Sequence, residues 1–175
     1  MTILKASFAA TLLLGLACTA VRADTADAGE AVLIGLGASA LYGAFIHEEG
    51  TEGRWQLLKS VALSEVVTEA LKTAIDKERP NGSCCTAFPS GHASKSFTAA
   101  HFLQRRYGWK AGGWAYAAAT FVAYTRVESD RHDEVDVIGG ALIGVLSSHL
   151  FTNRYVEVSP MIEGDVVGLT ASIRF

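Results

Sequence analysis

The sequence predicts a mainly α-helical protein, a bundle of helices followed by a C-terminal β-hairpin. Apolar residues recur at every third or fourth position through much of residues 24–154, as they do on one face of a helix. Residues 31–46, 111–125 and 137–153 are uncharged runs with the length of core helices. From residue 155 onward the pattern changes to the alternation of strands. A length of 175 residues allows one domain with a real core.

Residues 1–23 have the features of an export signal. Lys5 gives a positive start, residues 8–16 are apolar, and residues 21–23 match a small-residue cleavage site. A retained anchor helix is the alternative, although the apolar stretch is short for a bilayer span. Cys18 stands in a context only loosely like a lipoprotein cleavage site. We therefore expect an exported, periplasmic protein whose helical domain covers residues 24–154.

Net charge argues against nucleic acid as a partner. The full chain has a formal charge of −3, and removal of Lys5 and Arg22 with the signal takes it to −5. A mature chain of this charge repels the phosphate backbone. Cleavage also leaves Cys84 and Cys85 as the mature cysteines. Adjacent cysteines bridge only with a strained backbone, so free thiols, a vicinal disulfide and intermolecular pairing all stay open.

Contact with a membrane is expected at the surface of the protein rather than across a bilayer. The three uncharged runs are shorter than the roughly 20 residues that a spanning helix needs. Gly139, Gly140 and Gly144 allow close helix contacts in water or in lipid. Trp109 and Trp114 fit an interfacial belt or ordinary packing. The sequence favours a compact exported protein over a polytopic one and leaves its oligomeric state open.

An amphipathic helix is expected over residues 57–77 and is stopped by residues 80–83. Its apolar side is predicted to be the buried one, with charged and polar residues opposite. The apolar positions are Leu63, Val66, Val67, Ala70, Leu71, Ala74 and Ile75, and the polar ones are Glu65, Thr68, Glu69, Lys72 and Asp76.

Ser90 is placed to cap the next helix, and Gly108 to end it. The buried stripe of that helix is expected to hold Ala93, Phe97, Ala100, Leu103 and Tyr107. A hydrophobic helix over residues 111–125, a charged stretch over residues 126–134 and a glycine-rich helix ending near residue 151 follow. Residues 155–162 and 167–175 then alternate and are predicted to pair across residues 163–165 as a hairpin.

Three short clusters carry the chemistry: Lys72-x6-Arg79-Pro80, Pro89-Ser90-Gly91-His92 and Arg126-x5-His132-x3-Asp136. Together they supply three cations, two imidazoles, a hydroxyl and a carboxylate. Phosphoryl transfer builds charge on oxygen atoms that fixed cations and backbone amides stabilise. Each cluster alone has an ordinary structural explanation, such as a solvated lysine or a helix cap.

The second and third clusters have specific expected roles. Unpaired amides at the start of a helix favour an anion beside Ser90 and Gly91, where His92 can act as a general acid. His132 and Asp136 are four residues apart and share a face in a helical segment. A carboxylate bonded to one ring nitrogen leaves the other free to attack. Metal binding is the rival use of this pair, although no second ligand cluster accompanies it.

With these motifs the chain resembles the type 2 phosphatidic acid phosphatase superfamily, which also includes bacterial acid phosphatases and vanadium haloperoxidases. The family motifs are Lys-x6-Arg-Pro, Pro-Ser-Gly-His and Ser-Arg-x5-His-x3-Asp. The first two match without change, and the third has Thr125 where serine is usual. The resemblance covers residues 72–136 firmly and does not reach the C-terminal hairpin.

The resemblance implies a helical bundle and a phosphatase that needs no metal or other cofactor. It implies that His132 is the nucleophile, that Asp136 orients it, and that His92 protonates the leaving alcohol. The phosphate would be held by Lys72, Arg79, Ser90, Gly91 and Arg126.

A phosphorylated lipid is the expected substrate of this phosphatase, and a soluble phosphomonoester is the alternative. Halide oxidation with bound vanadate and non-catalytic binding of anionic lipid are the other functions to be separated from it.

Overall fold

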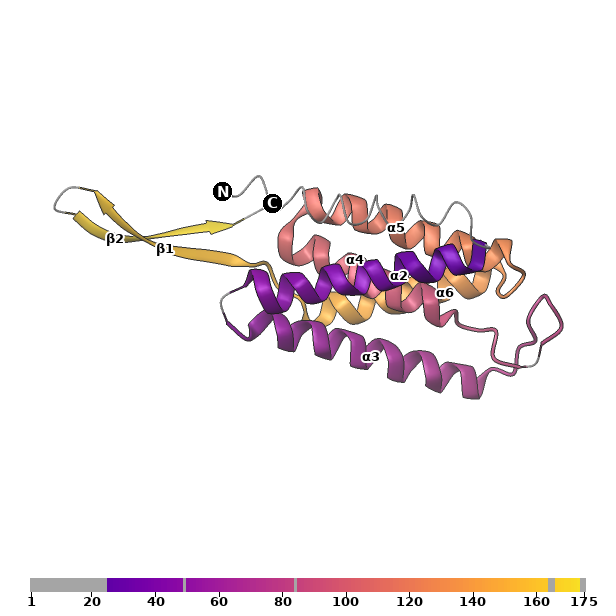
Figure 1. Ribbon diagram of the computed structural model, residues 1–175. Helices are drawn as coiled ribbons and strands as arrows, with labels where there is room; N and C mark the ends of the chain where they lie inside the picture. The colour runs from indigo at the N-terminus through magenta and orange to yellow at the C-terminus, as the bar shows by residue number, and fades with distance from the viewer. Residues whose placement is uncertain (1–24, 49, 84, 164–165, 174–175) are drawn as a thin grey trace.

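The computed structural model describes residues 25–48, 50–83, 85–163 and 166–173; the predicted signal segment lies outside them. Helices make up most of the described chain (Figure 1). They are α2 (Thr25–Tyr42), the π-helical turn η2 (Gly43–His47), α3 (Glu52–Ala74), α4 (Gly91–Tyr107), α5 (Trp109–Glu128) and α6 (Glu134–Phe151).

Helix α4 is the centre of the bundle and packs against α2, α3, α5 and α6. Small residues dominate its buried surface, so the surrounding helices approach it closely. The core includes Leu36, Ala40, Leu57, Ala99, Ala100, Phe102, Leu103, Ala115 and Ala119. Of the predicted stripe on α4, Ala93, Ala100 and Leu103 are buried, and Phe97 and Tyr107 are partly buried against the core.

Both ends of α4 follow the predicted local signals. Ser90 is the N-cap, and its hydroxyl accepts a hydrogen bond from the Ala93 amide at 3.5 Å. Gly108 ends the helix with a φ of 85°, a conformation that glycine adopts without a steric cost. The chain therefore turns sharply, and α5 begins at the next residue, Trp109.

Two glycines of α6 let this helix lie directly against the backbone of α4. A Cβ atom at Gly140 would lie 2.3 Å from the carbonyl oxygen of Ser90, and one at Gly144 would lie 2.4 Å from that of Ser94. No side chain fits at either position without moving a backbone. The close helix contacts predicted from these glycines are therefore confirmed.

The orientation of α3 differs from the prediction. Its buried face carries the small polar residues Ser60, Ser64 and Thr68, whereas Val66 is 66% exposed and Ile75 39% exposed. The hydroxyl groups bond across to α4, where Thr68 donates to Ser94 at 2.9 Å. The most deeply buried side of α3 is thus a row of hydroxylated residues, while the predicted apolar positions Leu63, Val67 and Leu71 are half-buried and Glu69 is exposed as expected.

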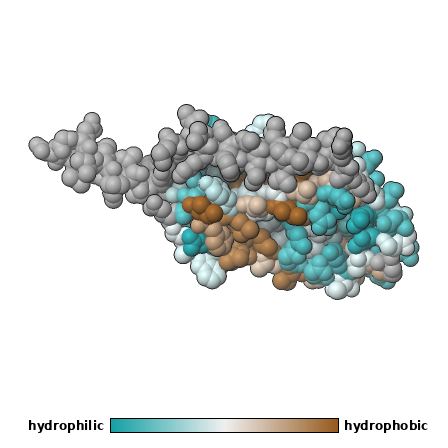
Figure 2. Space-filling model, in the orientation of Figure 1, coloured by the Kyte–Doolittle hydropathy of each residue, from teal (hydrophilic) through white to brown (hydrophobic). Residues whose placement is uncertain are grey.

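Exposed apolar residues also follow one side of α6. Val135, Ile138, Leu142, Leu146 and Leu150 are each 58–69% exposed. Residues 25–47 and 134–151 are long and apolar enough to cross a membrane. Figure 2 shows a hydrophobic patch over the middle of the visible face, with hydrophilic residues gathered towards the end where α3 finishes.

After α6 the backbone continues as the strands β1 (Val156–Glu163) and β2 (Val166–Ile173). The strands pair antiparallel, with Val156 opposite Ile173 and Glu163 opposite Val166. Figure 1 shows them extending away from the helices.

Candidate active site

All three sequence clusters meet at one end of the bundle. Lys72 lies in the last turn of α3, Ser90 and His92 lie at the start of α4, Arg126 lies in the last turn of α5, and His132 immediately precedes α6. Figure 1 shows this end on the right, beside the loop that joins α3 to α4. The helix starts of α4 and α6 add unpaired amides and positive dipole ends there.

The start of α4 provides a cradle for an anion. A Cβ atom at Gly91 would lie 3.3 Å from the Nζ atom of Lys72, so the ammonium group lies directly beside the helix start. Glu69 steadies this group through an ion pair of 2.9 Å. Ser90 is buried, and its backbone amide donates to the carbonyl oxygen of Asp136 at 2.9 Å. The cradle is thereby tied to α6.

The pKa of His92, in the first turn of α4, is shifted by burial and by the charges around it. Burial lowers its pKa to about 4, and the positive charges of Arg126 and Lys95 and the nearby His132 act in the same direction. Glu30 opposes them. In the free protein the imidazole is therefore neutral at pH 7 and lies within electrostatic reach of His132.

Arg126 is the most enclosed cation of the predicted set, with 1% of its surface exposed. Its guanidinium group donates to the carbonyl oxygen of Ala26 at the start of α2. The adjacent Thr125 is fully buried, and its hydroxyl donates to the carbonyl of Val122 at 2.8 Å. The threonine that replaces the usual serine thus keeps its hydroxyl bonded in a packed site.

Arg79 contributes a second guanidinium group from the loop between α3 and α4. Its Nη2 atom lies 3.4 Å from the hydroxyl of Thr86, whereas its buried Nε atom has no hydrogen-bond partner in the described part of the chain. Its charge helps to lower the pKa of His132, which locates it near that ring. A buried donor without a partner beside an imidazole suits an oxyanion ligand.

His132 is held by its Nδ1 atom. This atom lies 2.7 Å from the carbonyl oxygen of Ala87 and 3.6 Å from the Oδ2 atom of Asp136. The main-chain carbonyl, rather than the predicted carboxylate, is the hydrogen-bonding partner. Because a carbonyl only accepts, Nδ1 carries the proton and Nε2 keeps its lone pair. Burial first, and then Arg79, lower the pKa of His132, while Ala87 and Asp136 oppose them.

Asp136 has partners that sequence reasoning missed. Its Oδ1 atom accepts a hydrogen bond from Lys77 at 2.6 Å, and its Oδ2 atom accepts one from the Asp133 amide at 3.1 Å. In return, the side chain of Asp133, which is the N-cap of α6, accepts a hydrogen bond from the Asp136 amide. The Asp-x-x-Asp spacing is a capping-box signal that could have been found in the sequence, because each acid reaches the other's amide. Lys77 stands at an unspecified position of the first motif.

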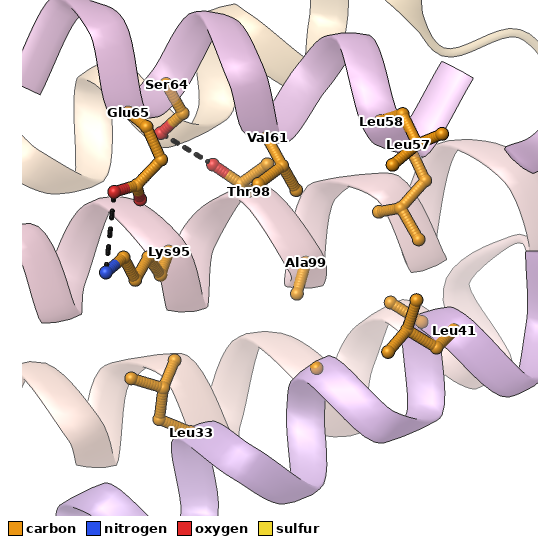
Figure 3. A pocket seen from close by; sticks show the side chains of 12 residues that line it. Leu33, Leu41, Leu57, Leu58, Val61, Ser64, Glu65, Lys95, Thr98 and Ala99 are labelled. Atoms are coloured by element: carbon orange, nitrogen blue, oxygen red, sulfur yellow. Dashed lines mark hydrogen bonds and ion pairs between the residues drawn. The ribbon is translucent and has the colours of Figure 1, made fainter. Parts of the chain in front are cut away.

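An apolar pocket of about 330 Å³ is walled by α2, α3 and α4 (Figure 3). Leucine, valine and alanine side chains line most of it, including Leu33, Leu57 and Val61. Glu65 and Lys95 form an ion pair of 3.4 Å at its wall. Lys95 stands three residues after His92 on α4, and its charge acts on that ring.

The described residues contain no group of three or more His, Cys, Asp or Glu side chains that could hold a metal ion. Cys85 is disulfide-bonded, with Cys18 and Cys84 both outside the described residues.

The helical bundle brings the cations and imidazoles of the three motifs to one of its ends, an arrangement whose chemistry suits a phosphoryl group. The PAP2 superfamily model matches residues 53–159, and the chain belongs to this family. The resemblance inferred from the three motifs is therefore confirmed.

Curated relatives of this chain are phosphatases, which are phosphoric ester hydrolases, the enzyme class that the motifs predict. Lipid A 4'-phosphatase of Helicobacter pylori is 32% identical over 114 residues, covering 59% of this chain and 58% of that protein. Lipid A 1-phosphatase of Porphyromonas gingivalis is 30% identical over 93 residues, covering 51% of this chain and 21% of that protein. The chain spans less than two thirds of each relative's length.

Solved structures show the same fold. The crystal structure of Aquifex aeolicus LpxE has a TM-score of 0.58 at 20% identity and covers 80% of this chain and 82% of its own. A transmembrane PAP2-type phosphatidylglycerolphosphate phosphatase from Bacillus subtilis has a TM-score of 0.54 at 21% identity, covering 84% of this chain and 94% of its own. These likenesses confirm the helical bundle; the C-terminal hairpin stays a prediction.

Proposed function

We propose that this protein is a metal-independent phosphatase that hydrolyses lipid-linked phosphate or diphosphate esters through a phosphohistidine at His132. The single observation that carries the proposal is the hydrogen bond from Nδ1 of His132 to the carbonyl of Ala87. This bond fixes the tautomer and leaves Nε2 with its lone pair, at the end of the bundle to which the three motifs bring their cations. A nucleophile held in this way satisfies the first requirement of covalent phosphoryl transfer.

In the first step, Nε2 of His132 attacks phosphorus, and the bond from phosphorus to the ester oxygen breaks as the N–P bond forms. Lys72, Arg79 and Arg126, with the amides around Gly91, stabilise the charge on the three phosphoryl oxygens. His92 gives a proton to the departing alcohol. The dianionic ester raises the pKa of His92 from its low value in the free protein, which makes the imidazole an acid when substrate is bound.

In the second step, His92 is neutral and takes a proton from a water molecule. The resulting hydroxide attacks phosphorus, the N–P bond breaks, and inorganic phosphate leaves. His132 regains its lone pair and His92 its proton. The same side chain therefore acts first as acid and then as base.

Three observations support a lipid as the substrate. The pocket lined in part by Lys95 has mostly apolar walls, contributed by α2, α3 and α4. Apolar side chains are exposed along α6 and on α3. The named relatives act on lipid A, according to their names. An ester with an apolar tail would place its phosphate in the cradle and its tail in the pocket.

We propose further that the bundle lies in a membrane with the catalytic end at its surface, and that residues 155–175 form a separate hairpin extension. The exposed apolar face of α6 and the length of residues 25–47 and 134–151 support the membrane location. The antiparallel register of β1 and β2 supports the extension. Export to the periplasm rests on the predicted signal in residues 1–23.

A substrate panel with purified protein in detergent micelles tests the function. Phosphatidic acid, lipid A and p-nitrophenyl phosphate are each assayed for phosphate release with excess chelator present. We expect hydrolysis that chelator does not reduce, with a higher kcat/KM for the lipids. Preference for the aryl phosphate would establish a soluble phosphomonoester substrate instead. Halogenation of monochlorodimedone with vanadate and peroxide would assign oxidation, and binding without turnover would assign lipid binding alone.

A further inference from the structure

Lys77 lies at the centre of a group of contacts that the proposed mechanism does not use. It follows α3 and donates to the Oδ2 atom of Asp133 at 2.5 Å and to the Oδ1 atom of Asp136 at 2.6 Å. Burial alone would lower its pKa, but the two carboxylates outweigh this effect and raise it. Lys77 is therefore a cation with two carboxylate partners, and it is not one of the phosphate-binding cations.

The main chain of Lys77 also bonds to Ala87, the residue whose carbonyl holds the His132 ring. The amide of Ala87 donates to the carbonyl oxygen of Lys77 at 3.0 Å. The carbonyl of the same Ala87 accepts from Nδ1 of His132. Lys77 thus holds both acceptors near Nδ1 of His132. Its main-chain carbonyl binds the amide of Ala87, and its ammonium group binds the carboxylate of Asp136.

The charge of Lys77 also bears on the protonation of His132. Charged and titratable groups of several elements act on this ring: Asp136 of α6, Arg79 of the α3–α4 loop and His92 of α4. Asp133 is the neighbour of His132 in the chain, and the carbonyl of Arg126 at the end of α5 accepts from the main-chain amide of His132 at 3.2 Å. Asp136 favours the protonated ring, and Asp133 is a second carboxylate beside Asp136 in the capping box. Lys77 contacts both carboxylates directly and offsets their charge, which acts in the same direction as the burial of the His132 ring.

We propose that Lys77 is a positioning residue for the phosphatase reaction, which fixes the His132 ring and offsets the charge of Asp136 and Asp133. The inference rests on the proposed function, since it assigns Lys77 a task in the chemistry of His132. The contacts of Lys77 set the orientation and the protonation state of the His132 ring. The substrate phosphate instead contacts Lys72, Arg79 and Arg126.

Lys77→Met tests this role in the full chain in detergent, with p-nitrophenyl phosphate as substrate. We expect kcat to fall about 10- to 100-fold, because small displacements of a reacting group have effects of that size. We expect KM to stay within about twofold, since Lys77 does not contact substrate. The acid limb of kcat/KM, which reports the free His132, should move up by about one pH unit because the carboxylates are no longer neutralised.

Lys77→Arg keeps the charge and should restore most of kcat and the original acid limb. Lys59→Met removes an exposed lysine of α3 outside the site and should match the wild type. If Lys77→Met does not fold, Lys77→Gln replaces it, because its amide still donates to a carboxylate while the charge is lost, and the same upward shift is expected.

An unchanged acid limb in the folded charge-removing variant would overturn the inference, as would a loss confined to KM, which would make Lys77 a substrate-binding group. Failure of the wild type to hydrolyse any phosphate ester would instead overturn the proposed function. The two failures are therefore distinguishable.

Discussion

The Nδ1 atom of His132 lies 2.7 Å from the carbonyl oxygen of Ala87, a residue 45 positions earlier in the chain. This contact connects the loop before α4 to the segment before α6, the two places where the sequence motifs place their histidines. It directs Nε2 away from the carbonyl. The position of the nucleophile therefore depends on a backbone atom that substitution of side chains does not remove.

His132→Ala should abolish turnover and leave the fold intact. Loss of the attacking nitrogen is expected to reduce kcat by about 10³-fold or more, since the covalent intermediate is proposed to form on this ring. Phosphate release and circular dichroism measure the two effects. His149→Ala, an exposed histidine of α6, is the matched control and should keep wild-type rates. Turnover near the wild-type rate in His132→Ala would refute the assignment of the nucleophile.

The pKa of His92 should rise when an anion enters the cradle. In the free protein it is lowered to about 4, mainly by burial and then by the charge of Arg126. Bound inorganic phosphate supplies negative charge that favours the protonated ring, so we expect an upward shift of about one unit or more. Titration of the His92 ring by NMR, with its resonance assigned from His92→Gln, measures the shift. Saturating phosphate with no change in the midpoint would contradict the placement of His92 at the anion site.

The same pKa predicts how stability depends on pH in the free protein. Because the pKa of His92 is below its ordinary value of 6.5 in the fold, folding favours the neutral ring. The contribution is fully present above pH 6.5 and is lost as the pH falls towards 4. Thermal unfolding in detergent should therefore show a larger fall in Tm between pH 6.5 and 4.5 for the wild type than for His92→Gln.

Local signals predicted α4 well, because its cap and its stop are single residues. The Ser90 hydroxyl accepts a hydrogen bond from the Ala93 amide, as expected of a serine N-cap. Gly108 adopts a positive φ, as expected of a glycine that ends a helix. That the three motifs meet at one end of the bundle could also be predicted, since the resemblance implies one phosphate site shared by all three. Lys77 could not be found in this way, because its partner Asp136 is 59 residues further on and only the folded chain brings them together.

The face of α3 could not be read from periodicity. A hydrophobic stripe shows that a helix has two different sides, but it assigns the apolar side to the interior only when water surrounds the protein. Here Ser64 and Thr98 bond to each other inside the bundle at 3.0 Å, and Val66 faces outward. Small hydroxylated residues between helices are typical of packing in membranes. The error thus itself supports the proposed membrane location.

Gly144→Ala should destabilise the fold. A methyl group there would lie 2.4 Å from the carbonyl oxygen of Ser94 and 2.8 Å from the amide of Thr98, so α6 must move away from α4. Overpacking of this kind costs about 1–3 kcal/mol. Gly113→Ala is the control in α5, because a methyl group there meets nothing within 4 Å and should be neutral or stabilising. Equal Tm values for the two variants would show that the helices are not in backbone contact.

The apolar pocket predicts a variant that affects lipid substrates alone. Val61 lines the pocket, whereas Val66 lies on the same helix, faces outward and is not part of the lining. Val61→Asn places a polar amide where the hydrocarbon tail would bind, and an unpaired polar group against an apolar surface costs about 1–3 kcal/mol. We therefore expect kcat/KM for phosphatidic acid to fall about tenfold, since 1.4 kcal/mol corresponds to that factor.

The activity of Val61→Asn on p-nitrophenyl phosphate should stay near the wild-type value, because this substrate has no tail and reaches only the cradle. Val66→Asn controls for the general effect of a polar residue on α3 and for altered binding to micelles. A parallel loss on both substrates would indicate damage to the cradle. Equal losses on phosphatidic acid in both valine variants would indicate that the tail lies elsewhere. Loss of activity on phosphatidic acid alone, in Val61→Asn alone, would show that the pocket and the phosphate cradle are parts of one substrate site.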